Sequence, residues 1–168
     1  TIRALASLPE DVRLLIVGPD PEGGRRRRGL MEEAERCGTA GRVGFAGCQP
    51  YEKIPLYLSA ADASVLASHR EGCPNVVLES LAAGTPVVAT AVGAVEDLLA
   101  GAEGGRVVPP HDAGRLAAAV AEVLETDWDA ERVRRAPAVR PWADVAGEVL
   151  RVLERALPEA HRAGGSGR

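Results

Sequence analysis

The sequence predicts an α/β fold in which a doubly wound parallel sheet carries helices on both faces. Short, continuous apolar segments alternate with segments of helical periodicity along most of the 168 residues. Such apolar segments are typical of strands that are buried on both faces. Because helices separate the strands, each crossover returns the chain to the same end of the sheet, and the strands run parallel.

The first half of the chain begins this alternation. Pro9 ends an apolar helical segment, and Gly18 ends the first apolar strand segment. The expected elements are the end of a helix at 2–8, a strand at 12–17, a Gly- and Arg-rich loop at 21–29, a helix at 30–37, a strand at 42–46, a short helix at 51–60 and a strand at 63–67.

The second half continues the alternation and closes with helices. Gly84 is expected to end one helix, and Asp112 to cap the start of another. The expected elements are a helix at 76–84, a strand at 86–90, a helix at 93–100, a strand at 106–110 and helices at 112–125 and 141–157. This order predicts a domain at 1–125, a helical segment at 126–157 and a disordered tail at 158–168.

The chain opens inside a helix and not before a strand. A doubly wound domain normally begins with its central strand. We therefore expect that the first strand precedes Thr1 and that the domain is truncated at its N-terminus.

Composition excludes several classes of partner. The net charge of −4 argues against the broad basic face that nucleic-acid binding requires. No apolar run reaches the roughly 18 residues that a membrane helix needs, and the first residues do not resemble a signal peptide. Three cysteines without a CxxC pair argue against a disulfide framework or a structural zinc site. A reducing cytoplasm is therefore the expected location.

Several ligand motifs are also absent from the sequence. It contains neither GxGxxG nor GxxxxGK[ST], which excludes dinucleotide dehydrogenases and P-loop NTPases. No cluster of His, Asp and Glu has metal-ligand spacing, so neither a metal nor another cofactor is expected. Arg25–Arg28 could bind phosphate, an acidic partner or a lipid surface, or could simply be a solvated loop. His69 and His111 follow strands and could act as acid or base, or could be exposed polar loop residues.

The most informative segment is SHREGCPNVVLE (68–79), which joins a strand to a helix. Free N–H groups at the start of that helix favour anionic or hydroxyl-rich ligands. Glu71 precedes the turn, and Glu79 lies about one helical turn past Asn75, with its side chain expected to lean back towards the helix start. A carboxylate there could accept hydrogen bonds from two vicinal hydroxyls. Spacing alone leaves open that both glutamates are merely exposed.

The segment EGCPNVVLESLAAGTPVVAT resembles the E-x7-E signature of family 4 retaining glycosyltransferases, the glycosyl transferases group 1. The stretches around 1–18, 42–68 and 105–124, and Trp142 with the last helix, are similar to further parts of that family. The resemblance implies one Rossmann-like half of a two-domain GT-B fold. It also implies transfer of a sugar from a UDP- or GDP-sugar, with retention of configuration, to an acceptor on an absent N-terminal domain.

The resemblance assigns roles to individual residues. Glu71 would be the catalytic-site carboxylate and would contact the donor sugar. Glu79 would accept hydrogen bonds from the ribose hydroxyls. Gly93 would line the diphosphate side. The remaining donor contacts would come from Gly72, Cys73, Asn75 and Val76 at the sugar and diphosphate, and from Gly47, Cys48 and Gln49 at the base.

Three residues depart from the family pattern: Cys73, Ser80 and Ala94 stand where a bulky apolar residue, alanine and glycine are usual. Two other functions stay open. One is a sugar-nucleotide epimerase or sugar-phosphate synthase of the same shape, and the other is a non-catalytic nucleotide-sugar-binding module. The resemblance also allows peripheral association of the full-length enzyme with the inner face of the membrane.

Overall fold

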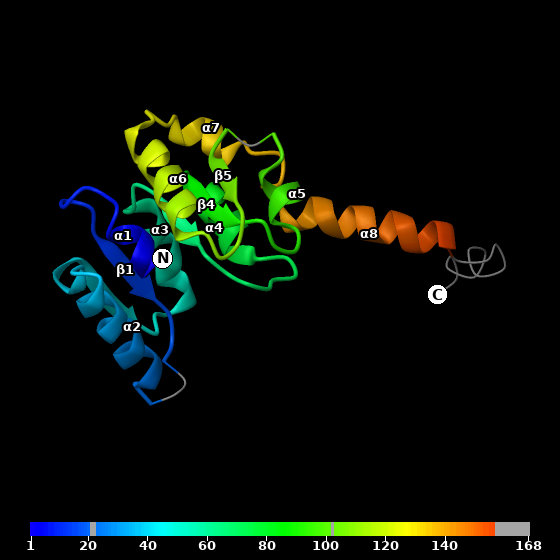
Figure 1. The fold of residues 1–168 in the computed structure, drawn as a ribbon. Helices are drawn as coiled ribbons and strands as arrows, with labels where there is room; N and C mark the ends of the chain where they lie inside the picture. Colours follow the sequence, from blue (N-terminus) through cyan, green and yellow to red (C-terminus); the bar gives the residue numbers. More distant parts are fainter. Residues whose placement is uncertain (21–22, 102, 157–168) are drawn as a thin grey trace. The chain divides into compact units, whose positions relative to one another are not determined.

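The computed structural model describes residues 1–156 except 21, 22 and 102. The chain forms two compact units, Thr1–Ala138 and a second unit that begins at Val139. Figure 1 follows the elements along the chain. The strands are β1 (Leu14–Val17), β2 (Val43–Gly47), β3 (Ser64–Leu66), β4 (Val87–Thr90) and β5 (Gly105–Val108). The helices of the first unit are α1 (Ile2–Leu5), α2 (Arg25–Arg36), η1 (Ala40–Arg42), η2 (Tyr51–Lys53), α3 (Ile54–Ser59), α4 (Asn75–Ala83), α5 (Val95–Leu99), α6 (Ala113–Glu125) and α7 (Ala130–Arg134).

Every strand pairing among the described residues is parallel, which confirms the predicted sheet type. β1 pairs with β2, with Leu14 opposite Val43. β4 lies between β3 and β5, and Val87 is the partner of both Ser64 and Gly105. β1 and β2 therefore end on the same side as each other, and so do β3, β4 and β5; in doubly wound domains ligands bind at the carboxyl ends of the strands.

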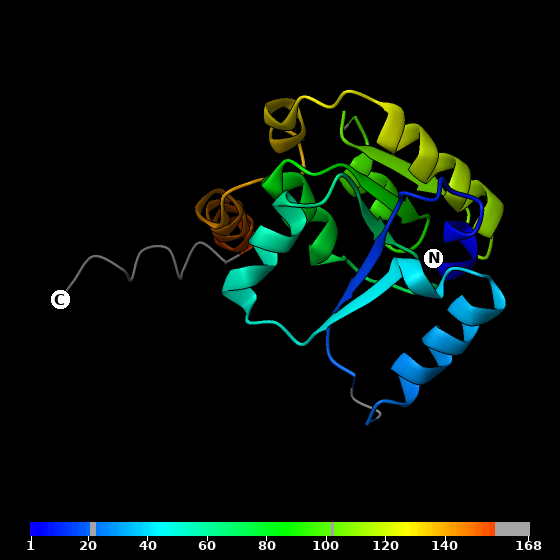
Figure 2. The same cartoon turned by 90° about the vertical axis from the view of Figure 1, so that its left-hand side faces the viewer.

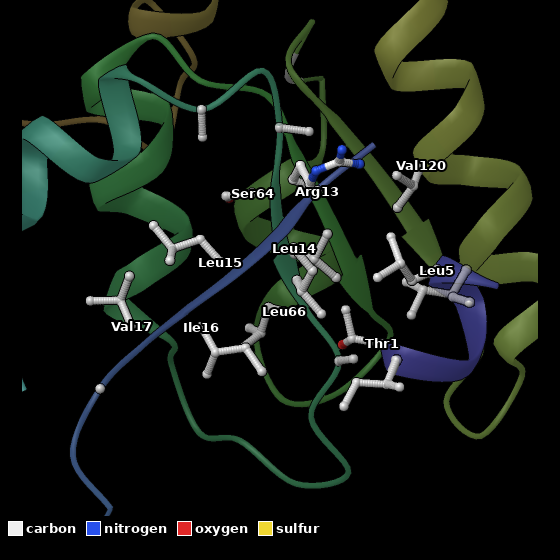
Figure 3. A pocket seen from close by; sticks show the side chains of 18 of the residues that line it. Thr1, Leu5, Arg13, Leu14, Leu15, Ile16, Val17, Ser64, Leu66 and Val120 are labelled. Carbon is white, nitrogen blue, oxygen red and sulfur yellow. The ribbon is translucent and has the colours of Figure 1, made fainter. Parts of the chain in front are cut away.

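The strands fall into two groups that do not pair with each other: β1–β2 and β3–β4–β5. An apolar cavity of about 2470 Å³ separates β1 from β3, and Figure 3 shows Leu14, Ile16 and Leu66 at its wall. Leu15, which also lines the cavity, is 53% exposed. The edges of β1 and β3 that face this cavity are not paired with each other, and an unpaired strand edge leaves backbone N–H and C=O groups open.

Helices cover both faces of the strands, as predicted. On one face, Leu116, Val120 and Val123 of α6 form a buried core with Leu5 of α1 and Val88 of β4. Figure 2 shows α6 in yellow and α1 in dark blue on the same side of the strands. On the other face, α4 and α5 bury apolar side chains completely: Val77, Leu81 and Val95. Burial of β4 on both faces explains its continuous apolar sequence.

The predicted loop at 21–29 is wrong in its second half. Residues 21 and 22 lie outside the described residues, but Arg25–Arg28 form the first turn of α2. Arginine is a good helix former, and Gly24 adopts a left-handed conformation just before the helix. The Asp20 carboxylate accepts a hydrogen bond from the Arg27 backbone N–H (3.2 Å). The arginine run is therefore a helix start whose side chains are exposed.

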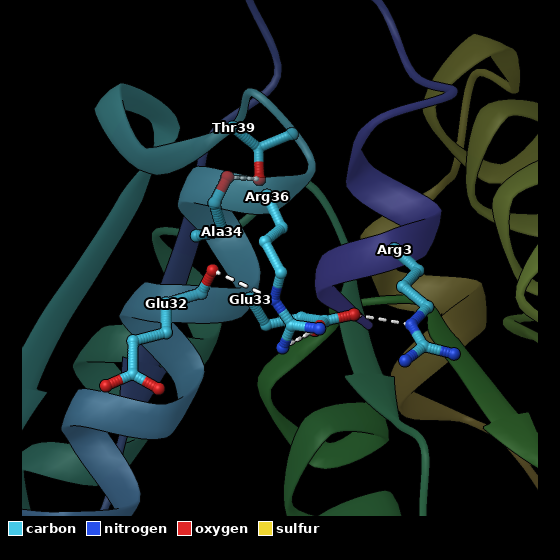
Figure 4. Close-up of polar contacts among 6 residues, drawn as sticks. All are labelled: Arg3, Glu32, Glu33, Ala34, Arg36 and Thr39. Atoms are coloured by element: carbon cyan, nitrogen blue, oxygen red, sulfur yellow. Dashed lines mark hydrogen bonds and ion pairs between the residues drawn. The ribbon is translucent and has the colours of Figure 1, made fainter.

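Helix α1 is tied to α2 by an ion pair between Arg3 and Glu33, drawn in Figure 4. The hydrogen bond from Arg3 lowers the pKa of the Glu33 carboxyl, and Arg36 of the same helix adds a second ion pair. Thr39 ends this region by donating to the Ala34 carbonyl at 3.3 Å. Of these contacts, the Arg3–Glu33 ion pair joins α1, which lines the cavity, to α2.

The second unit contains α8 (Trp142–Ala156), at the position predicted for the last helix. Arg140 precedes the helix and binds Glu148 through two hydrogen bonds, at 3.0 and 2.6 Å. This bidentate pair raises the pKa of Arg140 and lowers that of Glu148. No helix within the described ranges is long and apolar enough to cross a membrane.

Candidate functional site

The loop between β3 and α4, residues 67–74 (the 67–74 loop), lies at the carboxyl ends of the strands. Helix α4 follows it directly, with Pro74 buried at the N-cap position. No side chain caps this helix start. The first N–H groups of α4, those of Asn75 and Val76, are therefore open to a ligand that accepts hydrogen bonds, and the helix dipole adds positive potential.

The start of the 67–74 loop is held by Thr90 at the end of β4. The Thr90 hydroxyl donates to the Ser68 carbonyl at 2.7 Å and lies 3.3 Å from that of Leu66. The Ser68 hydroxyl donates in turn to Glu71 Oε1 at 2.7 Å. The Ser68 hydroxyl thus orients the exposed Glu71 carboxylate, and the buried Thr90 holds the backbone of Ser68.

The middle of the loop is held by the segment that follows β4. The Ala94 N–H donates to the Gly72 carbonyl at 2.9 Å. Gly93 has φ +55°, and a Cβ there would lie 2.5 Å from the Glu71 carbonyl oxygen and still closer to that of Gly72. The structure therefore brings together Glu71, Gly72 and Gly93, three of the residues that the sequence placed in the site.

Glu79 is half-buried on α4, and its Oε1 accepts a hydrogen bond from the Tyr51 hydroxyl at 3.3 Å. Tyr51 follows the loop after β2, the predicted base-binding loop. In that loop Gly47 and Cys48 are exposed, Gly47 has φ +68°, and Gln49 donates to the Ala46 carbonyl at 2.6 Å. The hydrogen bond from Tyr51 joins the predicted ribose carboxylate to the predicted base loop.

The remaining predicted residues face solvent. Cys73 and Asn75 are exposed, and Val76 is 38% exposed although it is apolar. Glu71 and Gly72 are exposed as well, so the exposed residues of the loop and the helix start lie on both sides of the buried Pro74. Within the described part of the chain, no group of three or more His, Cys, Asp and Glu side chains could hold a metal ion.

The sequence did not reveal two residues of the candidate site, Thr90 and Tyr51, or the contact between His69 and His111. We read Thr90 only as a match to the family motif and did not consider Tyr51. We treated His69 and His111 separately, whereas their rings stack with centroids 4.2 Å apart and planes 5° apart. The position of Tyr51, two residues after Gln49, was the one available signal, since a side chain next to a predicted base loop can reach the same ligand.

A doubly wound domain with an uncapped helix start, one carboxylate in the loop before that helix and a second on the helix itself has the features of a nucleotide-binding domain suited to a hydroxyl-rich ligand. Comparison with known proteins gives the particular family. The model of the family described as "Glycosyl transferases group 1" matches residues 1–139, so the chain belongs to this family. The family and the Rossmann-like GT-B half that the sequence predicted are thereby confirmed.

Named relatives agree with this assignment. The chain is 36% identical over 156 residues to the D-inositol 3-phosphate glycosyltransferase of Acidothermus cellulolyticus, covering 90% of this chain and 35% of that protein. It is 32% identical over 157 residues to the 2-deoxystreptamine N-acetyl-D-glucosaminyltransferase of Streptomyces fradiae, with 90% and 35% covered. The chain thus spans about a third of the length of these relatives.

Solved structures of two proteins share the fold. Anabaena Alr3699/HepE, in complex with UDP and glucose, has a TM-score of 0.81 and 25% identity, with 92% of this chain and 43% of that chain covered. Sucrose-phosphate synthase (tll1590) from Thermosynechococcus elongatus has a TM-score of 0.76 and 33% identity, with 93% and 42% covered.

Proposed function

We propose that this chain is the donor-binding half of a retaining glycosyltransferase that transfers a sugar from a nucleoside-diphosphate sugar to an acceptor. The observation that carries the proposal is the 67–74 loop with the start of α4. It presents Glu71, oriented by Ser68, beside uncapped helix N–H groups, with Glu79 on the same helix. One ligand that contains a sugar, a diphosphate and a ribose would use all three features.

In this proposal each feature acts on one part of the donor. Glu71 accepts hydrogen bonds from hydroxyls of the transferred sugar and orients it, without acting as a nucleophile. The N–H groups of Asn75 and Val76 stabilise the charge that grows on the leaving diphosphate. Glu79 accepts hydrogen bonds from the ribose hydroxyls, and the backbone of residues 47–49 contacts the base. The relative in complex with UDP and glucose supports a UDP-sugar as the first donor to test, with GDP-sugars next.

We further propose that the cavity between β1 and β3 holds a strand that precedes α1. Insertion there gives the order β2-β1-new strand-β3-β4-β5, which is the usual order of a doubly wound sheet in which the new strand comes first in the chain. The carboxyl end of that strand would lie between Gly18 and His69, which both line the cavity. The donor site of residues 1–125 would then be complete only with this strand, and an N-terminal domain would hold the acceptor.

The three cysteines are free, which fits a reducing compartment such as the cytoplasm. Peripheral attachment at the inner membrane face remains part of the proposal for the full-length enzyme.

A transfer assay with the full-length protein tests this function. UDP- and GDP-sugars are supplied with candidate acceptors, and NMR follows nucleoside diphosphate release and the anomeric configuration of the product. We expect transfer with the donor's configuration retained. Inverted products, or no reaction with any nucleotide sugar, would contradict the proposal.

The similarity to sucrose-phosphate synthase favours a second candidate, a synthase whose acceptor is a sugar phosphate. The same assay distinguishes it, because the synthase would form product only with phosphorylated sugar acceptors.

A further inference from the structure

His111 adopts an unusual backbone conformation at the end of β5. It has φ 63° and is the one non-glycine residue with positive φ in the described part of the chain. Side chains rarely adopt this region because Cβ approaches the backbone, whereas glycine enters it freely. Glycine at this position would therefore be less strained than histidine.

The backbone on both sides of His111 is fixed. Pro109 and Pro110 precede it, and each proline ring restricts φ. Asp112 follows it and caps α6, with its carboxylate accepting from the Arg115 N–H at 2.8 Å. The His111 ring therefore extends from a backbone segment, between β5 and α6, whose conformation is restricted on both sides.

The ring of His111 stacks on that of His69, with centroids 4.2 Å apart and planes 5° apart. His69 lies in the 67–74 loop, between Ser68 and Glu71, and is exposed. Because β4 lies between β3 and β5, the stack joins loops from two strands that do not pair with each other.

The other tethers of the 67–74 loop act on its backbone at Ser68 and Gly72. Between these two points, the structure records one side-chain contact for His69, the ring stack, and none for Arg70 among the described residues. On the N-terminal side of Glu71, two contacts from outside the loop hold it: Thr90 at Ser68 and His111 at His69. The His69–His111 stack is the nearer of the two to Glu71.

We propose that His111 is a positioning residue, which holds the 67–74 loop through His69 so that Glu71 stays in place for the donor sugar. This inference rests on the proposed function for its consequence in donor binding, but the effect on the loop itself does not depend on any ligand. The side chain that makes φ 63° strained at His111 is the same one that contacts the loop.

The test uses the full-length protein and four variants: His111→Gly, His69→Ala, the double variant, and His69→Phe, which keeps an aromatic ring. Hydrogen–deuterium exchange of residues 69–73 is measured without ligand. An aromatic pair stabilises by an amount that corresponds to a change of about two- to tenfold in an equilibrium. We expect exchange to be about two- to tenfold faster in His111→Gly and His69→Ala, no faster in the double variant than in either single one, and nearly normal in His69→Phe.

Two further readouts separate positioning from general stability. The melting temperature of His111→Gly should stay close to that of the unchanged protein, because relief of the backbone strain at φ 63° offsets the lost ring stack and the greater freedom of glycine in the unfolded chain. Affinity for UDP-glucose, used as the probe, should fall about two- to tenfold in the two single variants. Unchanged loop exchange would overturn the inference, and so would faster exchange throughout the protein with a lower melting temperature. If the variants change loop exchange as expected but the unchanged protein binds no nucleotide sugar, the result contradicts the proposed function alone.

Discussion

Gly93 lies against the backbone of Gly72 so closely that no side chain fits between them. The two residues belong to the segments that follow β4 and β3, and the Ala94 N–H fixes the contact by donating to the Gly72 carbonyl at 2.9 Å. The shape of the 67–74 loop therefore depends on the absence of a side chain in the neighbouring segment.

Gly93→Ala should displace the 67–74 loop. The new methyl group would collide with the Glu71 and Gly72 carbonyls, and alanine is also strained at φ +55°. Both effects together should lower the free energy of unfolding by about 1–3 kcal/mol and reduce nucleotide-sugar binding strongly. Chemical denaturation and calorimetric titration measure the two quantities. Gly29→Ala is a matched control, since Gly29 is helical with open space around it; equal effects of the two changes would refute the role of the close contact.

Thr90→Val should release the start of the loop while keeping the shape of the side chain. The buried hydroxyl that holds the Ser68 carbonyl at 2.7 Å is lost. We expect about 1–2 kcal/mol of destabilisation, with faster hydrogen exchange at residues 68–72. Thr126→Val removes an exposed hydroxyl that donates to the Glu122 carbonyl at 2.7 Å, and it should change stability by less than about 0.5 kcal/mol. A Thr90→Val protein with normal loop exchange would argue against this tether.

Glu71→Gln should separate sugar transfer from nucleotide binding. The change removes the negative charge that Ser68 orients, so transfer should fall by about tenfold or more, the loss expected for a hydrogen bond to a charged group. Affinity for the nucleoside diphosphate should stay nearly unchanged. Steady-state kinetics and titration provide the measurements, with Glu35→Gln, an exposed residue of α2, as the control. A large loss of diphosphate affinity would show that the roles of Glu71 and Glu79 are wrongly divided.

Residues 1–168 expressed alone should be poorly stable or self-associated, because the edges of β1 and β3 face an open apolar cavity. Adding roughly 20–30 upstream residues, enough for a strand, a loop and the start of a helix, should raise the melting temperature and restore nucleotide binding together. Thermal melts and light scattering of both forms are the measurements. A monomeric short form that melts as cooperatively and at the same temperature as the longer one would show that no strand belongs in this cavity.

The sequence predicted the order of the elements well because burial on both faces leaves a continuous apolar record in each strand, as in β4. It also placed the Asp112 cap and Glu71 beside the start of α4, since both depend on neighbours close along the chain. It missed the start of α2 because Gly23 and Gly24 indicate a loop, and the arginines directly after them were assigned to that loop although arginine favours helices. The Tyr51–Glu79 and His69–His111 contacts could not be predicted, because they depend on how separate crossovers pack.

In the proposed function, the segment from Glu71 to Glu79 holds a nucleotide sugar, and Glu79 binds the ribose. The most direct measurement is calorimetric titration of the full-length protein and of Glu79→Ala with UDP, with GDP, and with the 2′,3′-dideoxy form of whichever binds. We predict that Glu79→Ala lowers the binding free energy of the diphosphate by about 1.5–3 kcal/mol and that of the dideoxy form hardly at all. The dideoxy form lacks the two hydroxyls that would donate hydrogen bonds to the carboxylate. Equal losses for the two ligands, or no binding of either diphosphate to the unchanged protein, would contradict the claim.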